Sequence, residues 1–217
     1  MESPSGPDAS VASIRAYPAS RPDAPVLVFG HGAGAGHDHP WIRRVARDLA
    51  AAGVGVVTFD FPYRAEGRKL PDRGPVLEAA FEAVWASVAA TATGRLLAGG
   101  KSMGGRIASL VAARDAFLPR PAGLVFFGYP LHPPGKPDQR RDRHLPDIRV
   151  PMLFLHGTRD PFGTPEEMTS LVSGLERASL HLVEGGDHSL IAPRRQDPES
   201  LALGRAIEHT VRWVRSV

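Results

Sequence analysis

The sequence of 217 residues contains no cysteine. A disulfide framework, a thiol nucleophile and a metal site built on thiolates are therefore excluded. No run approaches the roughly 18 consecutive apolar residues that a membrane-spanning helix needs, and residues 1–10 lack the apolar core of a signal peptide. These absences predict a cytoplasmic protein with no membrane partner, in which residues 1–10 form a flexible N-terminal segment.

Net charge is also small. The chain carries 26 lysine and arginine residues against 23 aspartate and glutamate residues, which leaves a formal charge of +3. The arginine clusters within 43–47 and 140–143 have acidic residues close by, so they are typical of solvated surfaces rather than of a phosphate-binding face. We therefore expect no nucleic-acid partner.

Glycine and proline, in contrast, are abundant, with 23 and 21 residues. The hydrophobic content of 42% is ordinary for a globular protein and excludes global disorder. No internal repeat or linker divides the sequence, and a chain of this length can bury roughly 70% of its unfolded surface in one core. We expect residues 1–217 to form a single domain, with many glycines at turns that side chains would obstruct.

Short apolar runs alternate with amphipathic helical patterns along the chain. Runs this short and almost continuously apolar are typical of strands buried on both faces. Their alternation with helices predicts an α/β fold with a doubly wound, mostly parallel sheet. The proline-rich segment 131–148 is expected to be a surface excursion, too short for a lid domain. The expected strands are 26–29, 54–59, 96–98, 124–127, 152–155 and 180–183, with 11–17 as an edge strand, and the expected helices include 42–49, 77–88, 107–111, 164–167 and 203–214.

A nucleophilic serine is indicated at Ser102, within the Gly-Lys-Ser-Met-Gly sequence of residues 100–104. A strand is expected before this G-x-S-x-G pattern and a helix after it, and such a turn exposes the serine hydroxyl above the strand ends. The five-residue pattern also arises by chance, so the strand–turn–helix context carries the prediction. A phosphate-binding loop does not fit, because the first glycine of its motif would fall on Arg95.

A serine hydroxyl needs a base to remove its proton, and the base needs an orienting carboxylate. Asp160 follows the fifth long strand expected from the sequence, and His188 follows the sixth. Both side chains are expected at the carboxyl edge of the sheet, beside Ser102. Asp187 is the rival acid, but a direct neighbour of His188 is better suited to bond backbone N–H groups of its own loop.

A second glycine-rich loop, residues 30–36, follows the first long strand. In acyl transfer, two backbone N–H donors aimed at the developing oxyanion are worth roughly 3–4 kcal/mol each. One donor of this oxyanion hole is expected from Met103, the residue after the serine. We place the second at Ala33, with Gly34 as the alternative, and expect His31 to brace the loop.

Two other functions of this loop compete with an oxyanion hole. A relaxed dinucleotide-binding pattern is met by Gly30, Gly32 and Ala35, with Asp60 at the end of the next strand. That interpretation leaves the serine, acid and base downstream unexplained. A metal site at residues 37–39, His-Asp-His, has no identifiable third ligand. We therefore expect no cofactor and no metal.

Together these motifs resemble the α/β-hydrolase superfamily over nearly all of residues 26–217. The narrower likeness is to its small, lidless, dienelactone-hydrolase-like branch, which includes testis-expressed-protein and NSL-complex-subunit relatives. The resemblance implies an α/β-hydrolase fold without a lid domain, with Ser102 as nucleophile, Asp160 as acid and His188 as base. It is carried by Gly-Ala-Gly at 32–34, Phe-Asp-Phe-Pro-Tyr-Arg at 59–64, and residues 100–106, 128–136 and 156–162.

The expected activity is that of a serine hydrolase, which cleaves a small ester or thioester substrate through an acyl-enzyme. Tyr63, Arg64, Tyr129 and Phe162 stand on or beside strand-end loops and are candidates for the substrate pocket. Arg64 would anchor an acidic group, as arginines do in dienelactone hydrolases. Because some relatives resemble non-catalytic complex subunits, a binding or scaffold module on the same fold is the alternative.

Overall fold

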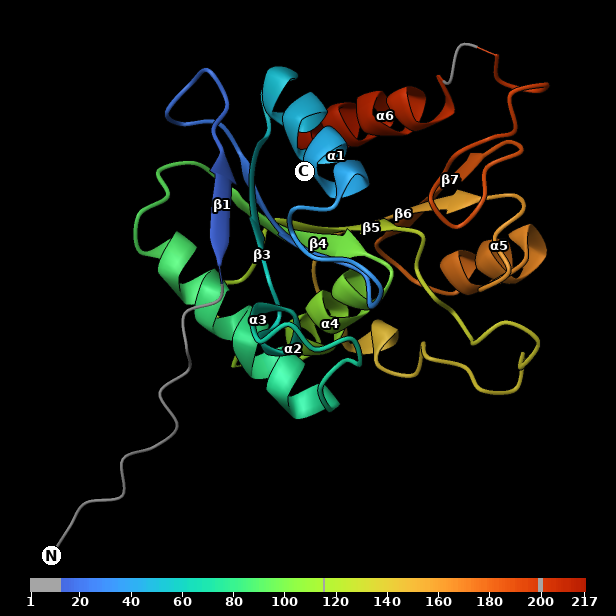
Figure 1. Cartoon of the computed structure of the whole chain (residues 1–217), viewed down its shortest axis with the longest axis horizontal. Coiled ribbons are helices and arrows are strands. Elements are labelled where there is room, and N and C mark those ends of the chain that lie inside the picture. Colours follow the sequence, from blue (N-terminus) through green and yellow to red (C-terminus); the bar gives the residue numbers. More distant parts are fainter. Residues whose placement is uncertain (1–12, 115, 199–200) are drawn as a thin grey trace, which may run out of the picture.

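The computed structural model describes residues 13–114, 116–198 and 201–217 as one mostly parallel sheet flanked by helices (Figure 1). The predicted flexible segment 1–10 lies outside these residues. The strand order is β1-β3-β2-β4-β5-β6-β7, and β1 runs antiparallel to β3 while the other neighbouring strands are parallel. The strands are β1 (Ile14–Tyr17), β2 (Val26–Gly30), β3 (Gly55–Phe59), β4 (Leu96–Lys101), β5 (Gly123–Phe127), β6 (Met152–Gly157) and β7 (Ala178–Val183).

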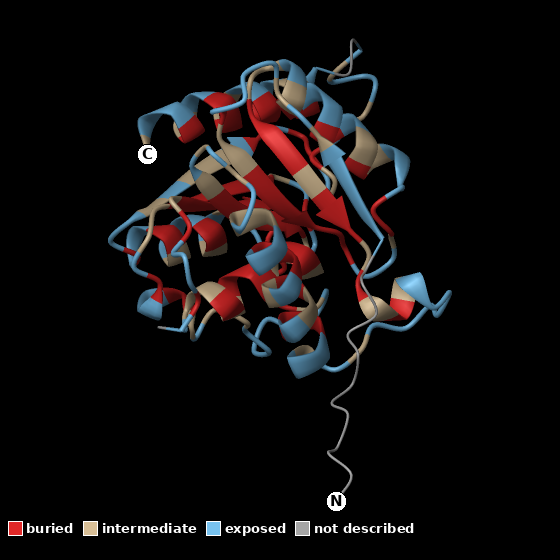
Figure 2. Cartoon of the chain, turned by 90° about the vertical axis from the view of Figure 1, so that its left-hand side faces the viewer, coloured by how far each residue is buried: buried red, intermediate tan, exposed pale blue. Residues whose placement is uncertain are grey.

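The helices cover both faces of this sheet. α1 and α6 lie on one face, and α3, α4 and α5 lie on the other, each layer enclosing its own apolar core (Figure 1). The strands are mostly buried between helices whose outer sides are exposed (Figure 2). The helices are α1 (Pro40–Ala51), α2 (Pro62–Ala65), α3 (Gly74–Ala89), α4 (Met103–Ala112), α5 (Pro165–Ser173) and α6 (Ala202–Ser216), with a short 3-10 helix, η1, at Leu145–Asp147.

The strand order brings the two glycine-rich loops together. β2 lies between β3 and β4, and the helices that follow β2 and β4 leave toward opposite faces of the sheet. In such sheets, ligands bind at the carboxyl edge where the loops diverge. Gly30 at the end of β2 pairs with Gly100 on β4, so the loops begin side by side.

The doubly wound α/β fold and its strands are confirmed. The edge strand is confirmed over Ile14–Tyr17, whereas residues 11–12 lie outside the described chain. Helix α2 is too short for a periodic pattern and is not predicted. The segment 131–148 carries only η1, and Leu131 and Leu145 anchor it in the core. The described residues therefore contain no inserted lid domain, and none of their helices is both long and apolar enough to cross a membrane.

Helix α5 begins with the capping box that the sequence predicts, and the cap can be tested. We expect Thr164→Ala to lower the free energy of unfolding by about 1 kcal/mol, measured by urea titration. The substitution removes Thr164 Oγ1, which accepts a hydrogen bond from Glu167 N, while Glu167 Oε2 accepts one from Thr164 N. Thr169→Ala is the matched control, because its exposed hydroxyl only returns to the Pro165 carbonyl within the helix. Equal losses in both variants would contradict the capping role.

Candidate active site

Ser102 stands at the sharp turn between β4 and α4. Its backbone has φ 49° and ψ −113°, a conformation that costs roughly 1–3 kcal/mol for a residue with a side chain. Glycine on both sides makes the turn possible. Gly100 has a φ of +156°, and a Cβ on Gly104 would overlap the carbonyl of Gly30 on β2. The predicted strand–turn–helix context of the serine is thus present in the structure.

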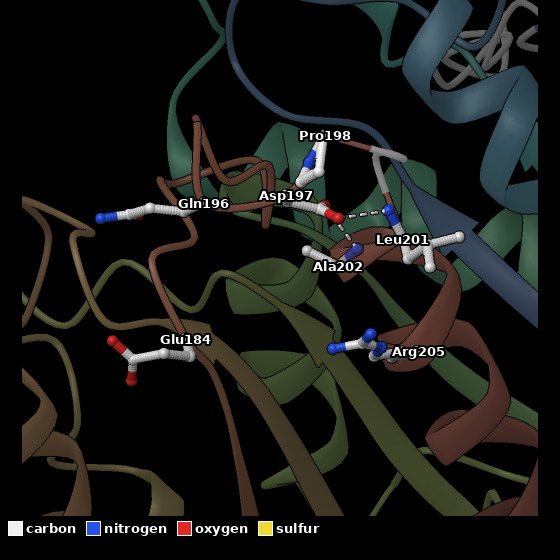
Figure 3. A pocket seen from close by; sticks show the side chains of 7 residues that line it. All are labelled: Glu184, Gln196, Asp197, Pro198, Leu201, Ala202 and Arg205. Carbon is white, nitrogen blue, oxygen red and sulfur yellow. Dashed lines mark hydrogen bonds between the residues drawn. The ribbon is translucent and has the colours of Figure 1, made fainter. Parts of the chain in front are cut away.

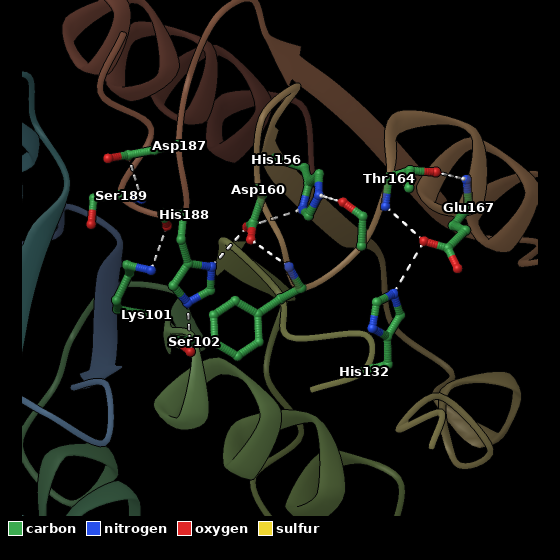
Figure 4. Close-up of polar contacts among 12 residues, drawn as sticks. Lys101, Ser102, His132, His156, Asp160, Thr164, Glu167, Asp187, His188 and Ser189 are labelled. Carbon is green, nitrogen blue, oxygen red and sulfur yellow. Dashed lines mark hydrogen bonds and ion pairs between the residues drawn. The ribbon is translucent and has the colours of Figure 1, made fainter. Parts of the chain in front are cut away.

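Three side chains from three strand-end loops form one line of hydrogen bonds (Figure 4). Ser102 Oγ lies 2.8 Å from His188 Nε2. On the other side of the ring, His188 Nδ1 lies 2.7 Å from Asp160 Oδ2. The structure therefore brings together the serine, histidine and aspartate that were selected from the sequence. A proton on Nδ1 leaves the lone pair of Nε2 facing the serine hydroxyl.

The carboxyl group of Asp160 is held in its ionised form. The residue is 5% exposed, and burial alone would raise its pKa. The hydrogen bond and charge of His188, the proximity of His156 and the N–H of Phe162 outweigh burial and lower the pKa of Asp160 below its ordinary value. Phe162 N donates to Asp160 Oδ1 over 2.9 Å. The second carboxylate oxygen remains on His188, where it can orient the ring.

Asp187 does not reach the histidine ring as an acid would. Its Oδ1 accepts hydrogen bonds from Ser189 N at 2.7 Å and from Ile191 N at 3.1 Å. These bonds close the loop that carries His188, and Figure 4 shows Asp187 beside Ser189 in this loop. The predicted role of Asp187, holding backbone N–H groups of its own loop, is confirmed.

The loop after β2 is held in place by several polar contacts. Tyr63 OH donates to the carbonyl of Ala33 at 2.8 Å. His31 Nδ1 lies 2.8 Å from Gly32 O, and Phe61 N donates to His31 Nε2 at 3.1 Å. Burial lowers the pKa of His31, which favours the neutral ring that this pattern requires. The bracing role expected of His31 is confirmed.

Ala33 is exposed at the outer end of this loop, and Met103 opens helix α4 immediately after Ser102. N–H groups in the first turn of a helix have no intrahelical acceptor, so Met103 N–H is free to face a ligand. The two predicted oxyanion donors therefore lie on the two loops that begin at the Gly30–Gly100 pair.

Tyr63 and Tyr129 lie elsewhere than expected. Their exposed fractions are 0% and 1%, because both rings pack into the core on the α3–α4 face. The Tyr129 hydroxyl donates to Arg141 O at 2.7 Å. Neither ring presents a face to solvent, which departs from the prediction that they line a substrate pocket. Instead, each hydroxyl holds a loop from the core side: Tyr63 holds the loop after β2, and Tyr129 holds the segment 131–148.

Phe162 and Arg64 lie at the edge where they were predicted. The Phe162 ring stacks on the His188 imidazole, with centroids 4.2 Å apart and planes at 29°, which limits how that ring can turn. Arg64 approaches the loop after β2, since a Cβ on Gly36 would lie 3.6 Å from its Nε. This buried Nε has no hydrogen-bond partner among the described residues.

Two residues that contact the histidine loop were missed in the sequence. Lys101 Nζ donates to His188 O at 2.5 Å, and Trp41 Nε1 donates to Ser189 O at 2.9 Å. The position of Lys101 inside the serine motif was the available signal. Trp41 stands 148 residues before its partner, and no local pattern links the two.

The alternative metal site at residues 37–39 is not assembled. His37 Nε2 contacts Ser13 Oγ at 3.1 Å, whereas His39 Nδ1 accepts from Trp41 N at the start of α1. Across residues 13–114, 116–198 and 201–217, no three His, Asp or Glu side chains gather in a metal-binding cluster.

A hollow of about 590 Å³ lies between β7 and the start of α6 (Figure 3). Asp197 occupies its wall and caps α6, with its two carboxylate oxygens accepting from Leu201 N and Ala202 N. None of Ser102, Asp160 and His188 lines this hollow, so it is separate from the site. Its lining residues are Glu184, Gln196, Asp197, Pro198, Leu201, Ala202 and Arg205.

Comparison with known proteins identifies the architecture. The family model described as "Alpha/beta hydrolase domain" matches residues 23–215. A dienelactone hydrolase from Anabaena variabilis superposes with a TM-score of 0.73 at 19% identity, covering 96% of this chain and 94% of the other. Est1E from Butyrivibrio proteoclasticus, with ferulic acid bound, superposes with a TM-score of 0.72 at 15% identity. The match covers 94% of this chain and 96% of the other.

XC6422 from Xanthomonas campestris, described as an α/β serine hydrolase without a lid, is also similar. Its TM-score is 0.66 at 20% identity, and the match covers 92% of this chain and 87% of the other. At these identities, the likenesses establish a shared fold, namely that of small α/β hydrolases without a lid.

The contact between β2 and the serine turn can be tested with a matched pair of glycine substitutions. We expect Gly104→Ala to abolish the native fold or lower the melting temperature severely, because its Cβ would overlap the Gly30 carbonyl. Gly204→Ala adds the same methyl group in the first turn of α6, where nothing lies within 4 Å. It should raise the unfolding free energy by about 0.5–1 kcal/mol. Thermal unfolding measures both, and a stable Gly104→Ala variant would refute the close contact.

Proposed function

Because the chain belongs to the α/β-hydrolase family, whose model spans residues 23–215, we propose that it is a serine hydrolase of small esters or thioesters. One observation carries this proposal. Ser102, whose backbone is strained at the turn between β4 and α4, is hydrogen-bonded to His188, and His188 is hydrogen-bonded to the buried carboxylate of Asp160. This is the arrangement that activates a serine hydroxyl as a nucleophile.

In the proposed reaction, Ser102 Oγ attacks the ester or thioester carbonyl carbon while His188 Nε2 accepts its proton. Asp160 fixes the tautomer of the ring and stabilises the imidazolium that forms. The imidazolium then protonates the departing alcohol or thiol, which leaves an acyl group on Ser102. A water molecule then gives a proton to His188 and attacks the acyl carbonyl. The imidazolium returns the proton to Ser102 Oγ as the acyl–oxygen bond breaks, which frees the acid and restores the enzyme.

The negative charge on the carbonyl oxygen needs donors that are in place before the reaction. We assign these to the N–H groups of Met103 and Ala33. Met103 N–H belongs to the first turn of α4, where the helix dipole also favours negative charge. The Ala33 carbonyl is tied to Tyr63 OH, which stabilises the conformation of the loop that presents the second donor.

Phe162 and Arg64 are the residues that we propose contact the substrate. Phe162, stacked on His188, offers an apolar wall close to the nucleophile. Arg64 would anchor an acidic substrate group, supported by its buried Nε, which has no hydrogen-bond partner among the described residues and lies beside the loop after β2. A dienelactone hydrolase and Est1E with bound ferulic acid are among the similar structures, and small carboxylate-bearing esters fit the same proposal.

The role of Ser102 is tested by Ser102→Ala. We expect kcat for p-nitrophenyl acetate to fall by a factor on the order of 10⁶, with an unchanged circular dichroism spectrum, because the nucleophile alone is removed. Ser173→Ala, on the exposed side of α5, is the control and should keep full activity. Labelling by a fluorophosphonate probe should be stoichiometric and should disappear with Ser102→Ala. Absence of labelling in the unaltered protein would favour a non-catalytic binding module.

The bracing of the proposed oxyanion loop is tested by Tyr63→Phe. Loss of the hydrogen bond to Ala33 O is worth about 1 kcal/mol, so we expect kcat to fall roughly fivefold with little change in KM. Tyr17→Phe is the control, because the buried Tyr17 hydroxyl on β1 has no hydrogen-bond partner among the described residues. Tyr17→Phe should leave kcat unchanged and should keep or raise the free energy of unfolding. A normal kcat in Tyr63→Phe would show that this hydrogen bond does not hold the proposed oxyanion loop in its active conformation.

A further inference from the structure

A buried lysine lies beside the histidine loop and has no part in the proposed proton relay. Lys101 is the last residue of β4 and is 8% exposed. Its stem passes beneath the loop after β2, where a Cβ on Gly32 would lie 3.6 Å from Lys101 Cγ. Its Nζ then donates to the backbone carbonyl of His188 at 2.5 Å (Figure 4). The ammonium therefore contacts the backbone of the same residue whose ring faces Ser102.

The surroundings of this ammonium leave its charge incompletely compensated. Lys101 forms no ion pair with any other described residue, and its Nζ lies over the Trp41 ring, 5.8 Å from the ring centroid. The carboxylates that attract it, Asp160 and Asp187, stand on the loops after β6 and β7, and His156 on β6 also faces it. Burial outweighs these attractions and lowers the pKa of Lys101 to about 8.

Lys101 also lies close to the imidazole of His188. Gly128, with a φ of +65°, shows this: a Cβ at this glycine would lie 3.1 Å from Lys101 Nζ and 3.2 Å from His188 Nδ1. The lysine and histidine nitrogens therefore flank one small space at the end of β5. A positive charge at that distance disfavours a second positive charge on the ring.

We propose that Lys101 is a positioning residue of the proposed hydrolase, whose ammonium holds the histidine loop by the His188 carbonyl and favours the neutral, proton-accepting form of the His188 ring. The inference rests on the proposed function for its catalytic consequence. An imidazole ordinarily titrates near pH 6.5, where Lys101 keeps its proton. The charge is therefore present over the pH range in which it would act on His188.

Trp41 allows the two roles of Lys101 to be separated. Trp41 Nε1 donates to Ser189 O at 2.9 Å, so two consecutive carbonyls of the histidine loop are held by donors from β4 and α1. Trp41 supplies a neutral donor, whereas Lys101 supplies a donor and a charge. Loss of either should loosen the loop, but only loss of Lys101 should change the protonation of the ring.

The first test compares pH profiles of kcat/KM for p-nitrophenyl acetate. In Lys101→Met, the acid limb should move to higher pH by roughly one unit, and plateau kcat should fall with little change in KM. In Trp41→Phe, kcat should fall while the acid limb stays in place. Lys69→Met removes one charge from an exposed position and should change neither quantity.

The second test follows the loop and the ring without using turnover. Hydrogen–deuterium exchange over residues 184–191 should be faster in both Lys101→Met and Trp41→Phe. The pH midpoint of the His188 ring resonances, identified by their loss in His188→Ala, should rise in Lys101→Met alone. If Ser102→Ala shows that the proposed function is wrong, these two measurements still decide the inference about Lys101.

The absence of cysteine from the chain permits a chemical rescue. The thiol introduced by Lys101→Cys can be alkylated in the unfolded state with 2-bromoethylamine, which restores an ammonium at nearly the original length. Alkylation with 1-bromopropane gives a neutral side chain of the same length. After refolding, the first product should recover the wild-type acid limb and the second should not.

The outcomes separate clearly. Faster exchange in Lys101→Met together with the shifted acid limb, or the shifted ring midpoint, supports the proposal. Faster exchange without either shift would reduce Lys101 to a structural hydrogen bond and overturn the proposed charge effect. If a folded Lys101→Met variant shows the wild-type exchange rate over residues 184–191, the positioning role is overturned.

Discussion

The site depends on one close backbone contact, that between the end of β2 and the serine turn after β4. Gly30 pairs with Gly100 across the two strands, and a Cβ on Gly30 would lie 3.0 Å from Gly104 Cα. Because no side chain separates these backbones, the loop after β2 and the turn at Ser102 start from a fixed, short separation. The proposed nucleophile and the proposed oxyanion donors owe their proximity to this contact.

The proposed base is positioned differently, through several hydrogen bonds to the loop that carries it. Asp187 closes the loop internally, and Asp160 holds the His188 ring. Lys101 and Trp41 bind consecutive carbonyls from two other elements. Each such bond contributes on the order of 1 kcal/mol, but together they fix the loop relative to β4, β6 and α1. The ring therefore faces Ser102 without any contribution from a lid.

Local patterns in the sequence predicted the fold and the three loops that carry Ser102, Asp160 and His188, because those features depend on short-range spacing. The role of Asp187 was predictable for the same reason, since its partners lie two and four residues away. Tyr63 and Tyr129 were misplaced because a position after a strand predicts the edge of the sheet but not the direction of a side chain. Short helix α2 turns Tyr63 into the core, and Arg141 O engages Tyr129 there. The contact of Lys101 with His188 spans 87 residues and follows only from the assembled sheet.

Two buried groups of opposite charge lie close to the His188 ring, the carboxylate of Asp160 and the ammonium of Lys101. A carboxylate stabilises a neighbouring positive charge and an ammonium opposes one, which is the basis of the role proposed for Lys101. Both are almost fully buried, at 5% and 8% exposure, so their fields act through protein rather than through water. An open sheet edge would ordinarily weaken such effects by solvation. Here β4, β6 and Trp41 of α1 lie beneath the site, and they enclose the charges of Asp160 and Lys101 in a region of low dielectric constant. In the proposed reaction, these buried charges therefore act on His188 from beneath the site rather than from a covering domain.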